Sequence, residues 1–122
     1  MGAVLVFLGG GLGSLFRYLM QSLGAHLFPG TFPWGTLIVN LTGSFLLGGL
    51  FGFGTAVHIR PEWRLLLATG FLGGYTTFSS WQLESWMLFS SGHWKMALGN
   101  LLGSTVLGLG ALVAGFMVGE RI

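Results

Sequence analysis

The apolar residues of the chain form four long runs separated by short polar segments. We place the runs at about residues 3–28, 34–57, 64–90 and 96–119. Each run has room for the ~20 residues that a helix needs to cross the hydrocarbon core of a bilayer. The pattern therefore predicts an all-α integral membrane protein, with one transmembrane domain over residues 1–122 and both termini on the same side.

The third apolar run is interrupted near its middle by residues that do not favour a helix. Gly73 and Gly74 are followed by Thr76 and Thr77, and both glycine and β-branched threonine weaken a helix. A break at membrane depth exposes backbone groups, so it persists only where protein, water or a bound ion satisfies them. We therefore expect the third helix to be broken mid-membrane and to adjoin an ion site.

Composition supports the membrane class. Only 7% of the residues are charged, whereas a soluble domain carries about 25%, so the chain has too few charges to cover a water-facing surface. The formal net charge of +2 is too small to indicate nucleic acid, and the absence of cysteine excludes disulfides and thiolate metal sites. The sequence contains no serine–histidine–acid set, paired carboxylates or phosphate loop, so we do not expect an enzyme.

The second run carries one stripe of small and polar residues. Thr36, Asn40, Gly43, Ser44 and Gly48 recur at spacings of three and four, which places them on one face of a helix. The Asn40 amide offers two N–H donors. It either bonds to a neighbouring helix or faces a path for an ion, and the pattern leaves both open.

The first and fourth runs carry small-residue motifs. Asn100, Ser104 and Gly108 repeat every four residues beside Gly99-xxx-Gly103, a pattern typical either of close helix packing or of donors that line a path. The motif Gly9-xxx-Gly13 predicts a face on which another helix approaches closely.

Aromatic and polar residues follow the predicted break. Phe78, Trp81, Gln82 and Ser85 share one helical face. Aromatic edges carry partial positive charge, so these rings favour an anion where water is scarce, although such a stripe is also typical of packing. Glu84 lies about two turns beyond the break, either as a partnered structural carboxylate or as a residue of the pathway.

Basic residues give little indication of orientation. Arg60, Arg64 and Arg121 lie on the side of the termini, and Lys95 lies on the other. Arg17 is the only basic residue well inside a run, where it is either functional or reaches toward the interface. Because the positive-inside rule barely separates the two orientations, we expect insertion in both directions and antiparallel packing of two copies.

The motifs resemble the Fluc (CrcB) family of bacterial fluoride channels over nearly the full length. The matching segments are Gly13-Ser-Leu-Phe-Arg-Tyr18, Gly35-Thr-Leu-Ile-Val-Asn-Leu-Thr-Gly-Ser-Phe45 and Gly70-Phe-Leu-Gly-Gly-Tyr-Thr-Thr-Phe-Ser-Ser80. The resemblance implies a dual-topology antiparallel homodimer in the bacterial inner membrane. It also implies two passive, fluoride-selective pores that export cytoplasmic fluoride and lower its toxicity.

The resemblance assigns roles to particular residues. Backbone carbonyls of Gly73 and Thr76 from both subunits would hold a central structural sodium ion, and Arg17 would lie near the aqueous vestibule. Trp81 stands where relatives have a second pore phenylalanine. The tryptophan keeps an electropositive edge and adds an indole N–H donor. Asn100 and Gly108 replace a tyrosine and a serine common in relatives. The fluoride-facing residues implied are Asn40, Thr77, Phe78, Ser79, Ser80, Trp81, Asn100 and Ser104.

Two other functions fit a small four-helix membrane protein. A proton-coupled exporter of the small multidrug-resistance type needs a glutamate in its first helix, whereas the only charge in the first run here is Arg17. A non-transporting subunit of a membrane assembly would use the polar stripes for packing alone.

Overall fold

The computed structural model describes residues 1–122 and contains helices and no strands, which confirms the all-α class. Three of its helices are long and apolar enough to cross a membrane: α1 (Gly2–Leu27), α2 (Trp34–Ala56) and α6 (Trp94–Arg121). The third predicted run is divided into shorter elements. These are α3 (Pro61–Arg64), a π-helix η1 (Leu65–Leu72), α4 (Gly73–Tyr75) and α5 (Phe78–Ser90).

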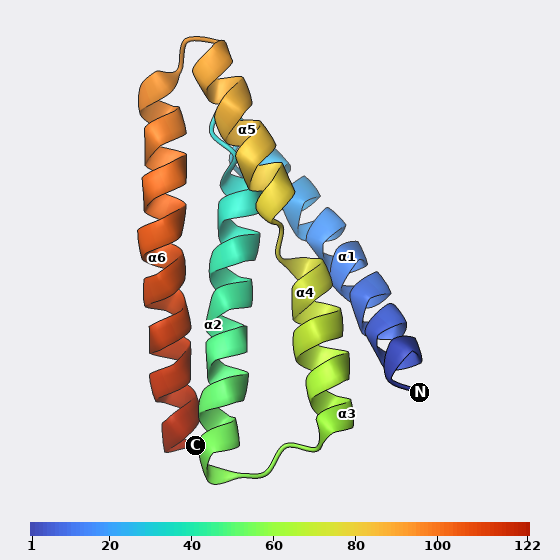
Figure 1. Cartoon of the computed structure of the whole chain (residues 1–122). Helices are drawn as coiled ribbons and strands as arrows, with labels where there is room; N and C mark the ends of the chain where they lie inside the picture. The colour runs from blue at the N-terminus through green and yellow to red at the C-terminus, as the bar shows by residue number, and fades with distance from the viewer.

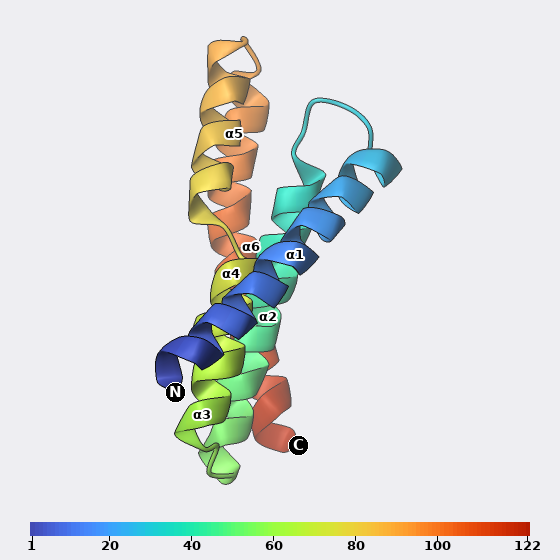
Figure 2. The same ribbon diagram turned by 90° about the vertical axis from the view of Figure 1, so that its right-hand side faces the viewer.

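The helices form an elongated bundle (Figures 1 and 2). Helices α2 and α6 run side by side along its length, and α5 folds back on α6 through a tight turn at one end. Helix α1 crosses the bundle obliquely and packs on η1 and α4. Both termini lie at the end that also holds the loop between α2 and α3.

Helices α2 and α6 pack through glycines. A Cβ atom added to Gly48 would overlap the carbonyl oxygen of Leu112, and one added to Gly115 would overlap the carbonyl oxygen of Phe45. Gly52 and Gly119 are equally close to the opposite backbone. Small residues at such positions let two helix backbones approach closely in a membrane, where helices associate through packing rather than through the hydrophobic effect.

Helix α1 approaches the third segment in the same way. Gly9 and Gly13 are buried, and a Cβ atom on either would overlap a carbonyl oxygen, that of Leu66 or that of Phe71. The predicted close-approach face at Gly9-xxx-Gly13 is therefore confirmed.

The second small-residue motif does not pack within this chain. An added Cβ atom at Gly99 or Gly103 would meet no atom within 4 Å. Helix α6 instead contacts α2 through Gly115 and Gly119.

The break in the third segment lies at Thr76 and Thr77 rather than at the preceding glycines. Thr76 (φ −78°, ψ 157°) and Thr77 (φ −144°, ψ 118°) are extended, whereas Gly73 and Gly74 are helical. Thr77 begins the next helix as its N-cap, because its Oγ1 accepts a hydrogen bond of 3.2 Å from the Ser80 N–H. The break predicted over Gly73 to Thr76 is therefore present, and it lies at the threonine end of that stretch and extends to Thr77.

Gly74 has a packing role instead. A Cβ atom there would overlap the carbonyl oxygen of Gly10 on α1. The π-helix that precedes α4 was not predicted: the N–H of Gly73 bonds to the carbonyl of Ala68, five residues back. Wide turns of this kind are rare and are often found at functional sites.

Candidate functional site

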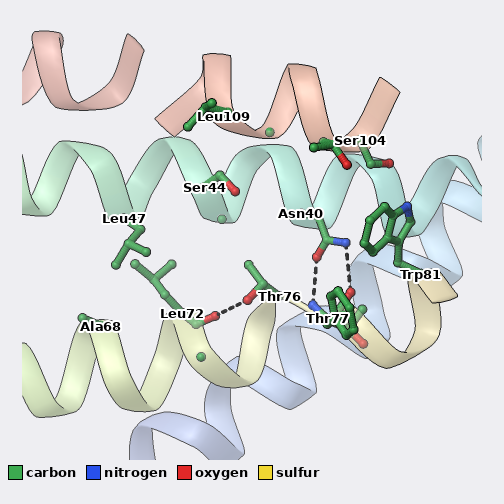
Figure 3. Close-up of a pocket in the computed structure, with 15 residues that line it drawn as sticks. Asn40, Ser44, Leu47, Ala68, Leu72, Thr76, Thr77, Trp81, Ser104 and Leu109 are labelled. Carbon is green, nitrogen blue, oxygen red and sulfur yellow. Dashed lines mark hydrogen bonds between the residues drawn. The ribbon is translucent and has the colours of Figure 1, made fainter. Parts of the chain in front are cut away.

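The break opens onto a groove of about 420 Å³ between the third segment, α2 and α6 (Figure 3). It is lined by side chains from all three regions of the bundle, although these regions are far apart in the sequence. Seven of the residues with predicted roles line this groove: Asn40, Gly73, Thr76, Thr77, Phe78, Trp81 and Ser104.

Asn40 on α2 closes the break by pairing with the backbone of Thr77. Its Nδ2 donates to the Thr77 carbonyl at 3.0 Å, and its Oδ1 accepts from the Thr77 N–H at 2.8 Å. In a continuous helix that N–H would bond to the carbonyl of Gly73. Of the two readings left open by the sequence, bonding to a neighbouring segment is confirmed, and one N–H of the amide remains free for another acceptor.

Arg17 reaches the break from the opposite side. Its Nη1 donates to the Thr76 carbonyl over a long distance of 3.5 Å. Helix α1 brings the side chain there by packing on η1 and α4. Sequence reasoning placed Arg17 near a vestibule and missed this contact, because the two residues are 59 positions apart and no local pattern links them.

The two aromatic residues of the groove meet edge to face. The ring centroids of Phe78 and Trp81 are 5.4 Å apart at an angle of 65°, and Phe78 is 71% exposed. The Trp81 indole N–H donates to the backbone carbonyl of Asn100 at 3.0 Å. The additional donor expected from this tryptophan is therefore used within the protein.

The other predicted pore residues occupy different places. Ser104 lines the groove, and its hydroxyl donates to Oδ1 of Asn100 at 3.3 Å. Asn100 is only 1% exposed and lies behind the groove. Ser79 is exposed and lines neither this groove nor the next cavity, whereas Ser80 faces that second cavity.

The second cavity, of about 440 Å³, lies between the α1–α2 connection and α5. A chain of hydrogen bonds crosses it, from Gln21 Nε2 to Thr36 Oγ1 at 3.0 Å and from the Thr36 hydroxyl to Glu84 Oε1 at 2.7 Å. Glu84 Oε2 is buried and has no protein partner. Glu84 is thus partnered through one oxygen and is free to accept a donor at the other.

Side chains that bind metal ions are not grouped in this chain. No three histidine, aspartate or glutamate residues lie together.

Comparison with known proteins identifies the family. A family model described as CrcB-like protein, Camphor Resistance (CrcB), matches residues 4–116. The chain belongs to the CrcB family. The residues that the family model matches include all those that line the groove, and curated relatives match the chain over most of both lengths.

Three of these relatives carry the name fluoride-specific ion channel FluC. The protein of Koribacter versatilis is 45% identical over 93% of this chain and 91% of its own length. The protein of Gloeobacter violaceus is 47% identical over 98% of this chain and 97% of its own length. The protein of Leptospira interrogans is 42% identical over 92% of this chain and 89% of its own length.

Proposed function

We propose that the chain forms a passive, fluoride-selective channel in the bacterial inner membrane that exports cytoplasmic fluoride and lowers its toxicity. Its CrcB-family relatives named as fluoride channels support the proposal. The observation that carries it is the groove at the broken third segment, which is lined by Asn40, Ser104 and the edge-to-face pair of Phe78 and Trp81. An ion channel of this kind catalyses no reaction and is not an enzyme.

The groove offers weak donors rather than charges to an anion. Fluoride is small and strongly hydrated, so a pore must replace its water with N–H, O–H and ring-edge contacts without binding it too tightly to leave. Asn40 has one N–H beyond its bond to Thr77. The exposed Phe78 presents a ring edge of positive partial charge, and Thr77 and Ser104 line the groove with hydroxyl groups, whereas Ser79 and Ser80 lie outside it.

A second copy is needed to enclose this groove. Phe78, which lines the groove, is largely exposed in the single chain, so the groove and its polar groups are not fully covered by this copy alone. In the proposed assembly, two copies pack antiparallel as a dual-topology homodimer, and each contributes residues to two pores. The nearly even distribution of basic residues between the two ends of the chain supports insertion in both directions.

The donor chemistry of the break fits a sodium ion between the two copies. The Gly73 carbonyl loses its helical donor because the Thr77 N–H bonds to Asn40, and the Thr76 carbonyl accepts one long bond from Arg17. Each chain thus supplies two carbonyl oxygens, so two chains supply a set of four hard ligands. The ion would be coordinated by these carbonyl oxygens and would hold the dimer together. It would not be transported.

The membrane potential is sufficient to drive export. A negative interior pushes an anion outward by about 2.3 kcal/mol per charge for each 100 mV. A passive pore therefore exports fluoride without a pump or a proton gradient.

Flux from liposomes tests this function. Purified protein is reconstituted into vesicles loaded with fluoride, and release is followed with a fluoride electrode without a proton gradient. Rapid release of fluoride with retention of chloride is expected. Absence of release would favour a non-transporting subunit, and export of an organic cation coupled to protons would favour the multidrug-resistance type.

A further inference from the structure

The peptide group between Thr76 and Thr77 is contacted by side chains from two helices. Its N–H, which belongs to Thr77, donates to Oδ1 of Asn40 on α2 at 2.8 Å. Its carbonyl, which belongs to Thr76, accepts a long bond of 3.5 Å from Arg17 on α1. The chain has no cis peptide bond, so this group is planar and its N–H and carbonyl point in opposite directions. A side chain that holds the N–H therefore also sets the direction of the carbonyl.

The Asn40 side chain is the main restraint on this peptide group. The N–H and the hydroxyl of Thr76 both bond to the Leu72 carbonyl at 3.0 Å, but these bonds leave the ψ angle of Thr76 free to turn the next peptide plane. Asn40 bonds on both sides of Thr77, to its N–H at 2.8 Å and to its carbonyl at 3.0 Å (Figure 3). Rotation of the plane would break the first of these bonds. The side chain of Asn40 thus fixes the direction of the Thr76 carbonyl.

The direction of this carbonyl matters because it is one of the two oxygens assigned above to a sodium ion. A carbonyl oxygen has two lone pairs, and the single long bond from Arg17 leaves one of them available. A peptide group is also a dipole, with its positive end at the N–H. If the group turned over, the N–H would face the cation in place of the carbonyl and would repel it.

We propose that Asn40 is a positioning residue of the sodium site, which aims the Thr76 carbonyl at the ion and does not contact it. This proposal rests on the sodium ion of the proposed function. There are two competing explanations. Asn40 serves only the ion path of the groove, in which case sodium binds equally well without it. Alternatively, Asn40 only stabilises the break, in which case its loss lowers stability by the same amount with and without sodium.

The sodium dependence of thermal unfolding separates these explanations. The dissociation constant of sodium is obtained from the rise of the melting temperature with sodium concentration, at constant ionic strength with N-methylglucamine. Asn40→Ala should raise this constant about tenfold. Thr55→Ala on the same helix is the control, because Thr55 bonds only to the Gly52 carbonyl, and it should leave the constant unchanged. An unchanged constant in Asn40→Ala would overturn the proposal, whatever its melting temperature or fluoride flux.

A measurement on the wild type keeps the test independent of how Asn40→Ala folds. Thr76 and Thr77 are the only two consecutive threonines, so threonine labelled with ¹³C at the carbonyl and with ¹⁵N gives one coupled pair of signals, from this peptide group. Labelling with ¹⁵N asparagine shows only two side-chain amides, those of Asn40 and Asn100.

Sodium should shift the signals of the peptide group and of the Asn40 amide with one dissociation constant. The amide of Asn100 is the control and should not move, because Asn100 is buried and does not line the groove. A shift of the peptide group without a shift of the Asn40 amide would overturn the proposal, and so would a protein whose unfolding and signals ignore sodium. A protein that shows these shifts but releases no fluoride would refute the channel function and leave the proposal standing.

Discussion

The Asn40 side chain bonds to both polar backbone groups of Thr77, because its amide donates to the Thr77 carbonyl and accepts from the Thr77 N–H, which has no helical partner at the break. A side chain of α2 thereby supplies hydrogen bonds at the break in the third segment. The polar backbone groups of Thr77 are thus not left without partners within the membrane. The same amide projects its remaining donor at the groove. One residue thus stabilises the break and contributes to the proposed ion path.

Asn40→Asp should suppress fluoride efflux. The carboxylate has no N–H for the Thr77 carbonyl, so two acceptors would face each other in a partly buried site. A penalty of about 1–3 kcal/mol corresponds to a loss of flux of about tenfold to hundredfold. Thr55→Ala on the same helix is the control, since Thr55 bonds only to the carbonyl of Gly52. Normal flux in Asn40→Asp, with the dimer intact by size exclusion, would remove Asn40 from the path.

Phe78→Ile should also suppress efflux while the dimer assembles. Isoleucine retains an apolar side chain of similar reach but has no electropositive ring edge. Phe89→Ile is the matched control, because Phe89 is a similarly exposed ring on the same helix that does not line the groove. Equal flux in the two variants would show that the ring edge of Phe78 has no specific role.

Arg17→Gln should weaken the dependence of flux on salt. The guanidinium of Arg17 lies at the break, where it attracts anions over a distance set by ionic screening. The screening length falls from about 10 Å at 0.1 M to about 3 Å at 1 M, so wild-type flux should fall between these concentrations at constant fluoride. Flux should be lower in the variant and should change less with salt. Identical salt dependence in both proteins would argue against this electrostatic role.

Removal of sodium should destabilise the proposed dimer. Without a cation, the carbonyl oxygens of Gly73 and Thr76 from two copies would face one another without a ligand to satisfy them, and their partial negative charges would repel. Exchange of sodium for N-methylglucamine is expected to lower the melting temperature and the fluoride flux, and readdition of sodium should restore both. If melting and flux are the same in both media, the proposed sodium site is wrong.

Gly48→Ala should destabilise the fold independently of the ion path. Its Cβ atom would overlap the Leu112 carbonyl on α6, and overpacking of this kind costs about 1–3 kcal/mol. Gly11→Ala is the control, because a Cβ atom there meets nothing within 4 Å and alanine favours a helix by about 1 kcal/mol. Thermal unfolding in detergent should show a lower midpoint for the first variant only.

The helices and the existence of a break could be predicted from local sequence. Apolar length indicates membrane helices directly, and the glycines and threonines of the third run indicate an interruption. The exact residues of the break within that stretch could not be predicted, because Gly74 is required for the contact with Gly10 on α1 and Thr77 is stabilised by Asn40 on α2. Both effects are tertiary contacts between helices, which local sequence does not show.

The site was predictable in its residue types but not in its pairings. Spacing placed Asn40, Trp81 and Ser104 on candidate faces, yet it did not show that the indole N–H of Trp81 is taken by the Asn100 carbonyl. Every residue has a backbone carbonyl, so a bond to a carbonyl on another helix cannot be predicted from the spacing of side chains. The contact between Arg17 and the Thr76 carbonyl could not be predicted for the same reason.

The central claim is that the groove at the break conducts fluoride passively and selectively. The most direct measurement is the reversal potential of purified protein in a planar bilayer, with a fluoride gradient across it and chloride equal on both sides. The account predicts a current that reverses at the equilibrium potential of fluoride and is unaffected by a pH gradient. A reversal potential near zero, or one that follows the proton gradient, would contradict it.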